Sequence, residues 1–267
     1  MKLTKSKLAK QANCSRSSLY YQKKQPLKDW KLKIKIEEAL HDHPSYGHKS
    51  LADHLKIGKD KILRVMKIFG LKPYRRRGKK YWKKAGKPQA VFPNLLQNEK
   101  ILPSRPNQIW VSDFTEFKWK GKKVYVATIL DLFTREILGY SVMLSHGVSL
   151  VINALLTALW QRPPPEILHS DQGSEYTSQG YVNLVELFGI KISMSHVASP
   201  WENGYQESFY SHYKVDFGDP NRFESLGELV YAVYQSIHYY NQDRIHSSLK
   251  MSPKNYLNHY LAMQKVS

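Results

Sequence analysis

The sequence predicts an α/β protein in which a mixed β-sheet flanked by helices follows a smaller all-α part. Up to about residue 74 the apolar residues recur with the helical period. From about residue 106, three runs of β-branched and aromatic residues come first, and shorter strands then alternate with helical segments. We therefore expect four regions: a helix-turn-helix unit at 1–26, a second helical unit at 27–74, a linker at 75–105 and the α/β domain at 106–267.

The excess positive charge of the chain lies entirely in its first part. Of the 267 residues, 1–105 hold 28 Lys and Arg against 7 Asp and Glu, a net charge of +21, whereas 106–267 hold 13 against 15, a net charge of −2. Such asymmetry is typical of a basic module that holds a polyanion. Double-stranded DNA is preferred to a membrane surface, because the basic residues lie in helix-turn-helix-like patterns and not on one long amphipathic helix.

Cysteine content and hydropathy restrict the class of protein further. The single cysteine, Cys14, excludes an internal disulfide and a zinc site built from several thiolates, and it fits a reducing compartment. No apolar run approaches the roughly 18 residues that span a bilayer, and the N-terminus lacks the apolar stretch of a signal peptide. We expect a soluble, cytoplasmic protein with no membrane partner.

The predicted unit at 1–26 consists of a short helix, a turn near Cys14 and a second helix. Ser15 is a suitable N-cap for that second helix, and the apolar contact between the helices would come from Leu8, Ala9 and Leu19. A helix-turn-helix fits this pattern, although any short basic αα-hairpin would resemble it.

The predicted unit at 27–74 contains three helices, at about 29–41, 49–55 and 59–69. The last of them carries cations on its outer face, where a recognition helix needs donors for phosphates and base edges. A solvated helix face is the alternative, and the tandem arrangement of two basic units favours DNA. The candidate DNA-binding residues here are Lys61, Arg64 and Lys67.

The segment 75–87 holds eight basic residues in thirteen, with Tyr81 and Trp82 among them. No core can form from it, so we interpret it as a linker that lies along DNA phosphates; a plain solvated linker is the compatible alternative. Its candidate DNA-binding residues are Arg75, Arg76, Arg77, Lys79 and Lys80.

Within 106–267 the pattern predicts five strands and four helices. The first three strands follow one another, with Gly121 at the first turn, and the remaining elements alternate. The expected strands are 108–117, 122–133, 135–145, 166–171 and 190–195, and the expected helices are 149–160, 178–188, 204–216 and 226–241.

Three carboxylates of this domain are candidates for chemistry. Asp113 lies inside an apolar strand, where a carboxylate is costly unless a partner or metal compensates it. Asp171 follows the predicted strand EILHS, and the carboxyl ends of strands are where α/β sheets form their sites. Glu207 lies on the predicted helix 204–216 and is expected to point into the sheet edge. Glu202 is a lesser candidate, because on the helical period it faces away from Glu207.

Two other side chains share the helix face of Glu207, namely Asn203 and Lys214. Three carboxylates make a hard, oxygen-rich site suited to two Mg²⁺ or Mn²⁺ ions. Such ions activate a water or a 3′-hydroxyl for in-line phosphoryl transfer, so no side-chain nucleophile is needed.

Five blocks of the domain together resemble the retroviral-integrase-type catalytic core of bacterial insertion-sequence transposases of the orfB type. Between Asp171 and Glu207 lie 35 residues, the spacing after which the D-D-35-E group is named. The segments CSRSSLYY, HPSYGHKSL and ILRVMKIFGLKP are similar to the N-terminal region of the same proteins. The five blocks are WVSDFTEF, LDLFTREILGY, HSDQGSEYTS, SPWENGYQESFY and YYNQDRIHSSLKMSPKNYL.

The resemblance implies an RNase H-like core in which Asp113, Asp171 and Glu207 are the catalytic metal ligands and Asn203 and Lys214 assist them. It further implies a bacterial, nucleoid-associated DNA transposase that cleaves element ends and joins them to target DNA. It implies a homo-oligomer on DNA, with a helix-turn-helix and leucine-zipper protein of the upstream reading frame as a further partner. For Arg244 and His246, which match a C-terminal motif, we expect a packing role.

Two other functions share most of these features. One is a catalytically silent DNA-binding regulator derived from a transposase, and the other is an RNase H-like nuclease or resolvase. Intact carboxylates disfavour the first, and tandem DNA-binding units disfavour the second. A tyrosine recombinase is set aside, because the sequence has no His-x-x-Arg pair.

Overall fold

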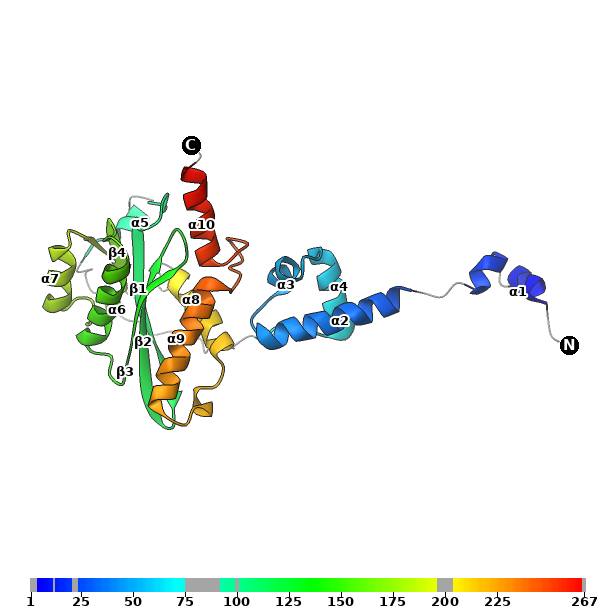
Figure 1. Cartoon of the computed structure of the whole chain (residues 1–267), viewed down its shortest axis with the longest axis horizontal. Helices are drawn as coiled ribbons and strands as arrows, with labels where there is room; N and C mark the ends of the chain where they lie inside the picture. The colour runs from blue at the N-terminus through cyan, green and yellow to red at the C-terminus, as the bar shows by residue number, and fades with distance from the viewer. Residues whose placement is uncertain are drawn as a thin grey trace. The chain divides into compact units, whose positions relative to one another are not determined.

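A computed structural model of the chain describes residues 4–11, 13–20, 24–74, 92–98, 101–195 and 204–265. The chain divides into two units, Met1–Lys72 and Pro73–Ser267 (Figure 1). Within the described residues, no helix is long and apolar enough to cross a membrane.

The first unit opens with helix α1 (Lys5–Gln11) and the short 3₁₀-helix η1 (Arg16–Tyr20). Ser15 caps η1 as expected, because its Oγ accepts a hydrogen bond from the Ser18 backbone N–H at 3.2 Å. The second helix is, however, a five-residue 3₁₀-helix and not an α-helix. Ala9 is buried, whereas the side chains of Leu8 and Leu19 lie outside the described part of the chain.

Three helices pack together in the rest of this unit: α2 (Gln25–Asp42), α3 (His48–Leu55) and α4 (Lys59–Phe69). The helix α2 begins earlier than expected, with Pro26 in its first turn, where a missing N–H costs nothing. The expected boundary after residue 26 therefore falls inside α2. The fully buried side chains at the centre of the unit are Ile36, Leu51, Ile62 and Val65.

The second unit contains a five-stranded mixed sheet, as the sequence predicts, and its strand order is β3-β2-β1-β4-β5 (Figure 1). The first three strands pair antiparallel, and β4 and β5 continue the sheet in parallel with β1. The strands are β1 (Ile109–Trp119), β2 (Lys122–Asp131), β3 (Ile137–Met143), β4 (Ile167–Ser170) and β5 (Lys191–Met194).

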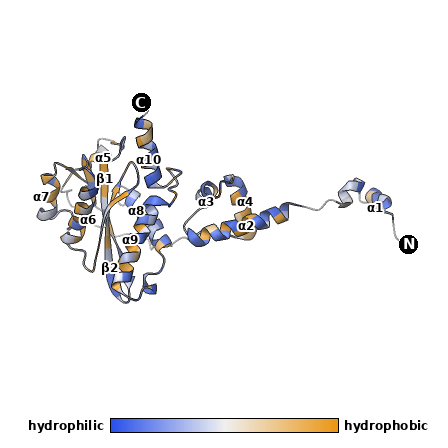
Figure 2. Cartoon of the chain, viewed as in Figure 1, coloured by the Kyte–Doolittle hydropathy of each residue, from blue (hydrophilic) through white to orange (hydrophobic). Residues whose placement is uncertain are grey.

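Helices cover both faces of this sheet, which confirms the expected layers. One face packs against α6 (Val148–Gln161) and α7 (Gln179–Leu187), and the other against α8 (Gly204–Phe217) and α9 (Leu226–Gln242). Figure 2 shows hydrophobic residues concentrated along the sheet, whereas the helices carry residues of both kinds, as amphipathic covering helices do.

The helix α6 approaches β3 closely because residue 139 is glycine. A Cβ atom there would lie 2.2 Å from the Ala154 carbonyl oxygen and 2.6 Å from the Ala158 nitrogen. Both neighbours are backbone atoms and have no room to yield. The small residues Gly139, Ala154 and Ala158 therefore set the distance between this helix and the sheet.

Three elements of the second unit are not anticipated by the sequence patterns: α5 (Leu95–Asn98), the 3₁₀-helix η3 (Pro220–Arg222) and α10 (Pro253–Gln264). The segment before β1 joins the sheet unit, because the Met194 N–H donates to the Pro93 carbonyl at 3.1 Å and the Leu95 N–H donates to Ser193 Oγ at 3.0 Å. Part of the expected linker 75–105 thus packs with the α/β unit.

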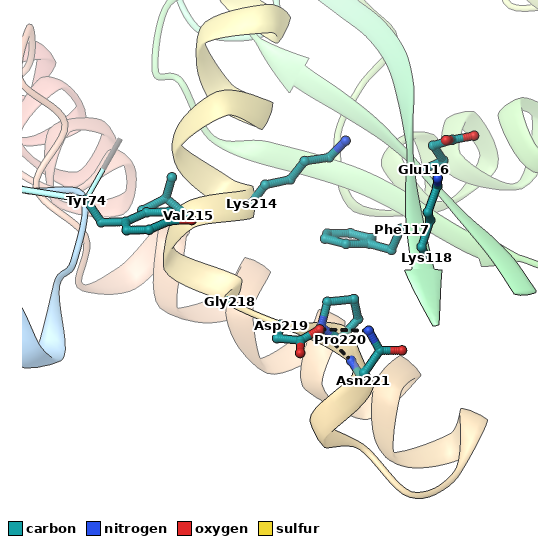
Figure 3. Close-up of a pocket in the computed structure, with 10 residues that line it drawn as sticks. All are labelled: Tyr74, Glu116, Phe117, Lys118, Lys214, Val215, Gly218, Asp219, Pro220 and Asn221. Carbon is teal, nitrogen blue, oxygen red and sulfur yellow. Dashed lines mark hydrogen bonds between the residues drawn. The ribbon is translucent and has the colours of Figure 1, made fainter. Parts of the chain in front are cut away.

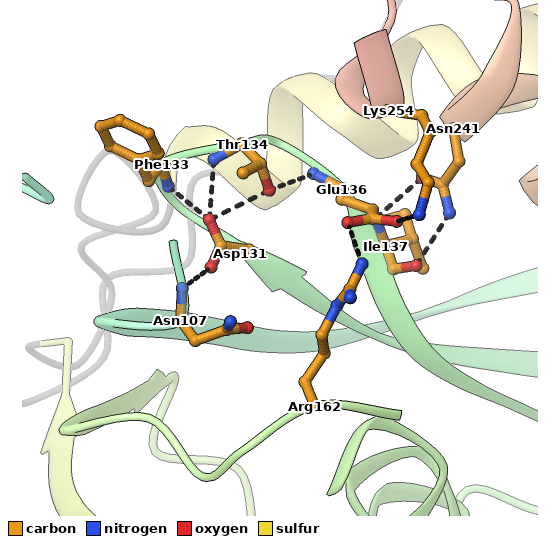
Figure 4. A network of polar contacts seen from close by, with 9 residues as sticks. All are labelled: Asn107, Asp131, Phe133, Thr134, Glu136, Ile137, Arg162, Asn241 and Lys254. Carbon is orange, nitrogen blue, oxygen red and sulfur yellow. Dashed lines mark hydrogen bonds and ion pairs between the residues drawn. The ribbon is translucent and has the colours of Figure 1, made fainter. Parts of the chain in front are cut away.

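A polar network holds the turn between β2 and β3 (Figure 4). The Asp131 carboxylate accepts hydrogen bonds from the backbone N–H groups of Asn107, Phe133 and Thr134 at 2.5 to 2.8 Å. The nearby Glu136 carboxylate pairs with Arg162 at 2.9 Å. Both acids are buried, and the hydrogen bonds and the ion pair offset the free-energy cost of removing their charges from water.

The same network joins α9 to the outer strand β3. The Asn241 side chain accepts from the Ile137 N–H and donates to the Ile137 carbonyl, each at 2.9 Å, as a neighbouring strand would (Figure 4). Lys254 at the start of α10 lies 3.7 Å from Glu136. The C-terminal helices are thereby attached to the sheet through the LDLFTREILGY segment.

We expect Asn241→Ala to lower the free energy of unfolding by about 1–3 kcal/mol, because it leaves the N–H and carbonyl of Ile137 without partners. Urea unfolding followed by tryptophan fluorescence measures the change. Asn153→Ala, at an exposed position of α6, is the matched control and should leave the midpoint unchanged. An equal midpoint for both variants would contradict this role of Asn241.

Candidate active site

Asp113 lies in the middle of β1, directly opposite Thr128 of β2. Its Oδ1 accepts a hydrogen bond from the Phe114 N–H at 2.8 Å. Burial, together with the nearby Asp171 carboxylate, raises the pKa of Asp113 to about 7, although the Phe114 N–H and the Lys214 ammonium act in the opposite direction. The ionised form of Asp113 is therefore disfavoured in the folded protein, as expected for a carboxylate in an apolar strand.

Asp171 follows β4, the strand that pairs in parallel with β1. Val111 lies opposite His169 in this pairing. Asp113 and Asp171 each follow two residues later, so the two acids lie at neighbouring positions of the parallel strands. The Asp171 Oδ1 accepts from the Gly173 N–H at 3.0 Å. Burial raises the pKa of Asp171, and the Glu175 carboxylate adds to that rise.

The loop after Asp171 brings a further carboxylate, Glu175, beside it. A Cβ atom on Gly173 would lie 3.0 Å from Glu175 Oε2 and 3.1 Å from Asp171 Oδ1, so only glycine leaves both oxygens in place. Glu175 is buried and lies 2.6 Å from Nδ1 of His146, whose ring stacks on Phe114. Burial favours a higher pKa for Glu175, yet the hydrogen bonds from His146 and Ser174 leave its pKa below the ordinary value.

The sequence patterns did not single out this Glu175–His146 pair. Glu175 stands inside the HSDQGSEYTS block, four residues after Asp171, and that position was its only signal. His146 belongs to the loop between β3 and α6, and nothing in its neighbourhood along the chain connects it to Glu175.

The helix α8 is fixed to the sheet by two buried polar side chains, Gln206 and Tyr210. The Gln206 amide donates to the Val111 carbonyl at 2.9 Å, and the Tyr210 hydroxyl donates to the Asp113 carbonyl at 2.8 Å. Tyr210 also lies 2.8 Å from the Thr128 hydroxyl, opposite Asp113. Neither residue is predicted from the sequence, because a glutamine and a tyrosine on a helix carry no signal comparable to the Glu207 carboxylate.

Glu207 is exposed on α8, and its neighbour Gln206 occupies the position against the sheet that we expected for Glu207. The Glu207 charge still raises the pKa of Asp113 slightly, so the three carboxylates share one electrostatic field. Among the described residues, however, no three His, Cys, Asp or Glu side chains lie close enough together to hold a metal ion.

The donor chemistry of the site nevertheless fits a divalent cation. All three carboxylates offer the hard oxygen atoms that Mg²⁺ and Mn²⁺ prefer. Burial raises the pKa values of Asp113 and Asp171 because it disfavours their charged forms, and a bound cation would stabilise those charged forms. Lys214 supplies a weaker compensation and lies 5.6 Å from the Phe117 ring centre.

The candidate DNA-binding residues of α4 are exposed, but one of them also has a structural partner. The Arg64 guanidinium hydrogen-bonds the Asp29 carboxylate of α2 at 2.8 and 2.5 Å, which lowers the pKa of Asp29. Lys61 and Lys67 remain at the surface. The other candidates, Arg75, Arg76, Arg77, Lys79, Lys80 and Asn203, lie outside the described residues.

The C-terminal motif residues make packing contacts. The Arg244 Nε donates to the Asp216 carboxylate at 2.7 Å, so the end of α8 is tied to the segment after α9. The His246 backbone pairs with Met251, and burial lowers the pKa of His246 to about 4. These contacts agree with the packing role that the sequence favoured.

Comparison with known proteins agrees with this fold. Residues 103–200 and 188–253 match two family models, each described as "Integrase core domain". A chain of the simian T-cell lymphotropic virus intasome, solved with the PP2A regulatory subunit B56 gamma, superposes with a TM-score of 0.50 and 16% identity over 82% of this chain and 73% of its own. The second unit is thus an integrase core of the DDE polynucleotidyl transferase superfamily.

Bacterial relatives give the narrower family. An uncharacterized transposase-like protein of Haemophilus influenzae is 35% identical over 77% of this chain and 95% of its own length. The putative transposase of the insertion sequence element IS150 of Escherichia coli is 33% identical over 94% and 92%. The chain belongs to the insertion-sequence transposases of this integrase-core type.

We expect Asp113→Asn to stabilise the metal-free protein by about 2 kcal/mol at ~pH 8, since one pKa unit corresponds to about 1.4 kcal/mol and Asp113 is only half-buried. A carboxyl whose pKa rises from 3.8 to about 7 on folding penalises the folded state when ionised. The penalty is full above the folded pKa, shrinks as the pH falls through it, and vanishes below the unfolded value.

Urea unfolding in the presence of a chelator, at pH values above and below this window, measures the effect. Glu186→Gln, at an exposed position on α7, is the control and should change nothing. A destabilised Asp113→Asn protein at the higher pH would show that the carboxylate is not strained in the metal-free state.

Proposed function

We propose that this transposase cleaves DNA at the 3′ ends of its element and joins those ends to target DNA by metal-dependent in-line phosphoryl transfer. The observation that carries the proposal is the placement of Asp113 within β1 and of Asp171 at the end of the adjacent parallel strand β4, both with raised pKa values, beside the helix that bears Glu207. Two carboxylates held together at such a cost are typical of metal sites.

The proposed ligands of two Mg²⁺ or Mn²⁺ ions are Asp113, Asp171 and Glu207. When bound, the ions would supply Lewis acidity that activates the attacking oxygen and stabilises the leaving oxygen. Gln206 and Tyr210 hold the helix and the Asp113 backbone in register, so they position the ligands. The positive charge of Lys214 favours the ionised form of Asp113. We propose that Asn203, at the start of the helix, assists the three metal ligands.

The two reaction steps need no side-chain nucleophile. In cleavage, the oxygen of a water attacks phosphorus, the bond from phosphorus to the 3′-oxygen breaks, and a 3′-hydroxyl is released. In joining, that 3′-hydroxyl attacks a phosphodiester of the target, a new phosphorus–oxygen bond forms, and the target strand's own 3′-oxygen leaves.

The basic first part of the chain is proposed to hold the DNA. Lys61, Lys67 and the arginines at 75–77 would neutralise phosphates. Arg64 would both contact a phosphate and keep its ion pair with Asp29. The viral chain with a similar fold was solved as part of an intasome, which supports the proposal of a homo-oligomer on DNA. We further propose that a helix-turn-helix and leucine-zipper protein of the upstream reading frame is a partner of this chain, and that the chain acts in the bacterial cytoplasm.

A catalytically silent regulator is the second candidate, and exposed Glu207 favours it, since the described residues hold no assembled metal cluster. An RNase H-like nuclease is the third. Incubation of the protein with element-end duplexes and Mg²⁺ separates them: cleavage with joining identifies the transposase, cleavage alone the nuclease, and binding alone the regulator.

We expect each of Asp113→Asn, Asp171→Asn and Glu207→Gln to abolish cleavage and joining while leaving DNA binding intact, because each removes one metal ligand and none alters the basic part of the chain. Gel-based end-cleavage assays and binding titrations measure the two properties. Glu186→Gln on α7 is the matched control. Wild-type joining by any of the three variants would remove that residue from the site.

We also expect substitution of Arg75, Arg76 and Arg77 by glutamine to weaken DNA binding and to reduce the slope of log K against log salt by about 3, one for each lost phosphate contact. Substitution of the same three residues by lysine keeps the charge and should keep the slope. If the glutamine variant shows the wild-type slope, the segment does not lie along phosphates.

A further inference from the structure

The loop between β3 and α6 places His146 beside both segments that carry the proposed aspartate ligands. Its Nδ1 lies 2.6 Å from Oε1 of Glu175, in the turn that follows Asp171. Its ring stacks on the ring of Phe114, the residue after Asp113, with the ring centres 6.0 Å apart and the planes 13° from parallel. One side chain from a third element thus contacts the surroundings of both acids.

The contact between His146 and Glu175 leads from the surface to a buried carboxylate. The exposed fraction of the side chain is 56% for His146 and 9% for Glu175. Beside this contact, the ring centre of Tyr125 lies 4.9 Å from that of His146. Because most of the His146 side chain is exposed, a substitution at this position removes the hydrogen bond without opening the core.

Glu175 depends on this hydrogen bond to remain ionised while it is buried. An ionised carboxylate only accepts hydrogen bonds, so the Nδ1–H of His146 is the donor of the 2.6 Å contact. The Ser174 hydroxyl donates to Oε2 of Glu175 at 3.2 Å. Burial raises the pKa of Glu175, but the hydrogen bonds outweigh burial and leave the pKa lowered. His146 therefore holds a charged group inside the turn.

The turn from Asp171 to Thr177 closes around Gly173. The Gly173 N–H donates to Oδ1 of Asp171 at 3.0 Å, and the Gly173 carbonyl accepts from the N–H groups of Tyr176 and Thr177 at 3.0 and 3.1 Å. The carboxylates of Asp171 and Glu175 flank the same point above Gly173. A movement of Glu175 would therefore disturb the hydrogen bond that orients Asp171.

The opposite face of β1 carries a different charged group, Lys214. Its side chain extends from α8 toward β1 (Figure 3), and its charge lowers the pKa of Asp113. Phe117, beside Lys214, packs on the α8 side of the sheet, whereas Phe114, beside His146, packs on the α6 side. Lys214 and the pair of His146 with Glu175 thus act on the site from different faces of the sheet.

We propose that His146 and Glu175 are a positioning pair, whose hydrogen bond holds the 171–177 turn in the conformation that presents the Asp171 carboxylate to a metal ion. The inference rests on the proposed function, because it names what holds one of the proposed ligands in place. In this role neither residue touches the metal ion or the DNA. Loss of a group that supports a metal ligand typically lowers metal affinity by roughly 10- to 100-fold.

The first test is amide hydrogen exchange of the segment 171–177 in the metal-free, full-length protein. His146→Phe keeps an aromatic ring against Phe114 but cannot donate the hydrogen bond, so we expect exchange of this segment to become about tenfold faster. Glu175→Gln keeps an acceptor for His146 and should keep the wild-type rate. His238→Phe, at an exposed position of α9, is the matched control and should also keep it.

Exchange of the buried strand β2 reports whether each variant is folded and should be the same in all of them. A wild-type rate of the turn in His146→Phe overturns the inference. So does a Glu175→Gln protein whose turn exchanges as fast as that of His146→Phe, because the hydrogen bond would then not be what holds the turn.

The second test is Mn²⁺ binding to the same proteins without DNA, measured from the electron paramagnetic resonance signal of the free ion. We expect His146→Phe to bind Mn²⁺ about tenfold more weakly. A purely electrostatic role of His146 predicts the opposite sign, because loss of a positive ring favours a nearby cation. Unchanged or tighter binding therefore overturns the inference.

Asp171→Asn removes a proposed ligand and sets the scale for the loss of Mn²⁺ binding. The two tests also separate the inference from the proposed function. A wild-type protein that binds no Mn²⁺ contradicts the proposed metal-dependent function, whereas the exchange rates of the turn still decide whether the pair of His146 and Glu175 holds it.

Discussion

Burial of the Asp113 and Asp171 carboxylates at the pairing of β1 with β4 is the constraint on which the rest of the α/β unit depends. The parallel pairing of β1 and β4 brings the two acids together, and burial removes the water that would otherwise separate their charges. The surrounding structure offsets part of this cost with the Phe114 and Gly173 N–H groups and with the Lys214 ammonium. In the metal-free protein the charges of Asp113 and Asp171 are therefore only partly compensated, at the position where the proposed metal ion would bind.

Much of the fold could be predicted because its periodicities are strong. The strands β1 to β3 and the helix α6 stand out as β-branched runs and as an apolar helix. The helix α10 was not predicted, although Ser252 and Pro253 are a usual helix start and the Ser252 Oγ does accept from the Asn255 N–H. Its pattern is weak because only Pro253 and Leu257 of its residues are buried.

The candidate site was only partly accessible from the sequence. Asp113 is conspicuous as a charge in an apolar strand, and Asp171 and Glu207 are linked by their spacing. Gln206 and Tyr210 give no such signal, because an amide and a phenol on a helix are unremarkable until the carbonyl groups that they meet are known. Contacts between residues far apart in the chain, such as His146 and Glu175, depend on the parallel topology, which periodicity does not encode.

The blocks that identify the family combine chemistry with architecture. WVSDFTEF and HSDQGSEYTS bring carboxylates to the sheet, whereas LDLFTREILGY and the C-terminal block meet each other through Asn241 and Ile137. This contact also occupies the N–H and carbonyl of Ile137 on β3, the end strand of the sheet. An uncovered end strand is a template onto which another polypeptide can add and aggregate. The amide of Asn241 occupies both groups at Ile137, so another strand cannot pair with β3 at that residue while this contact is made.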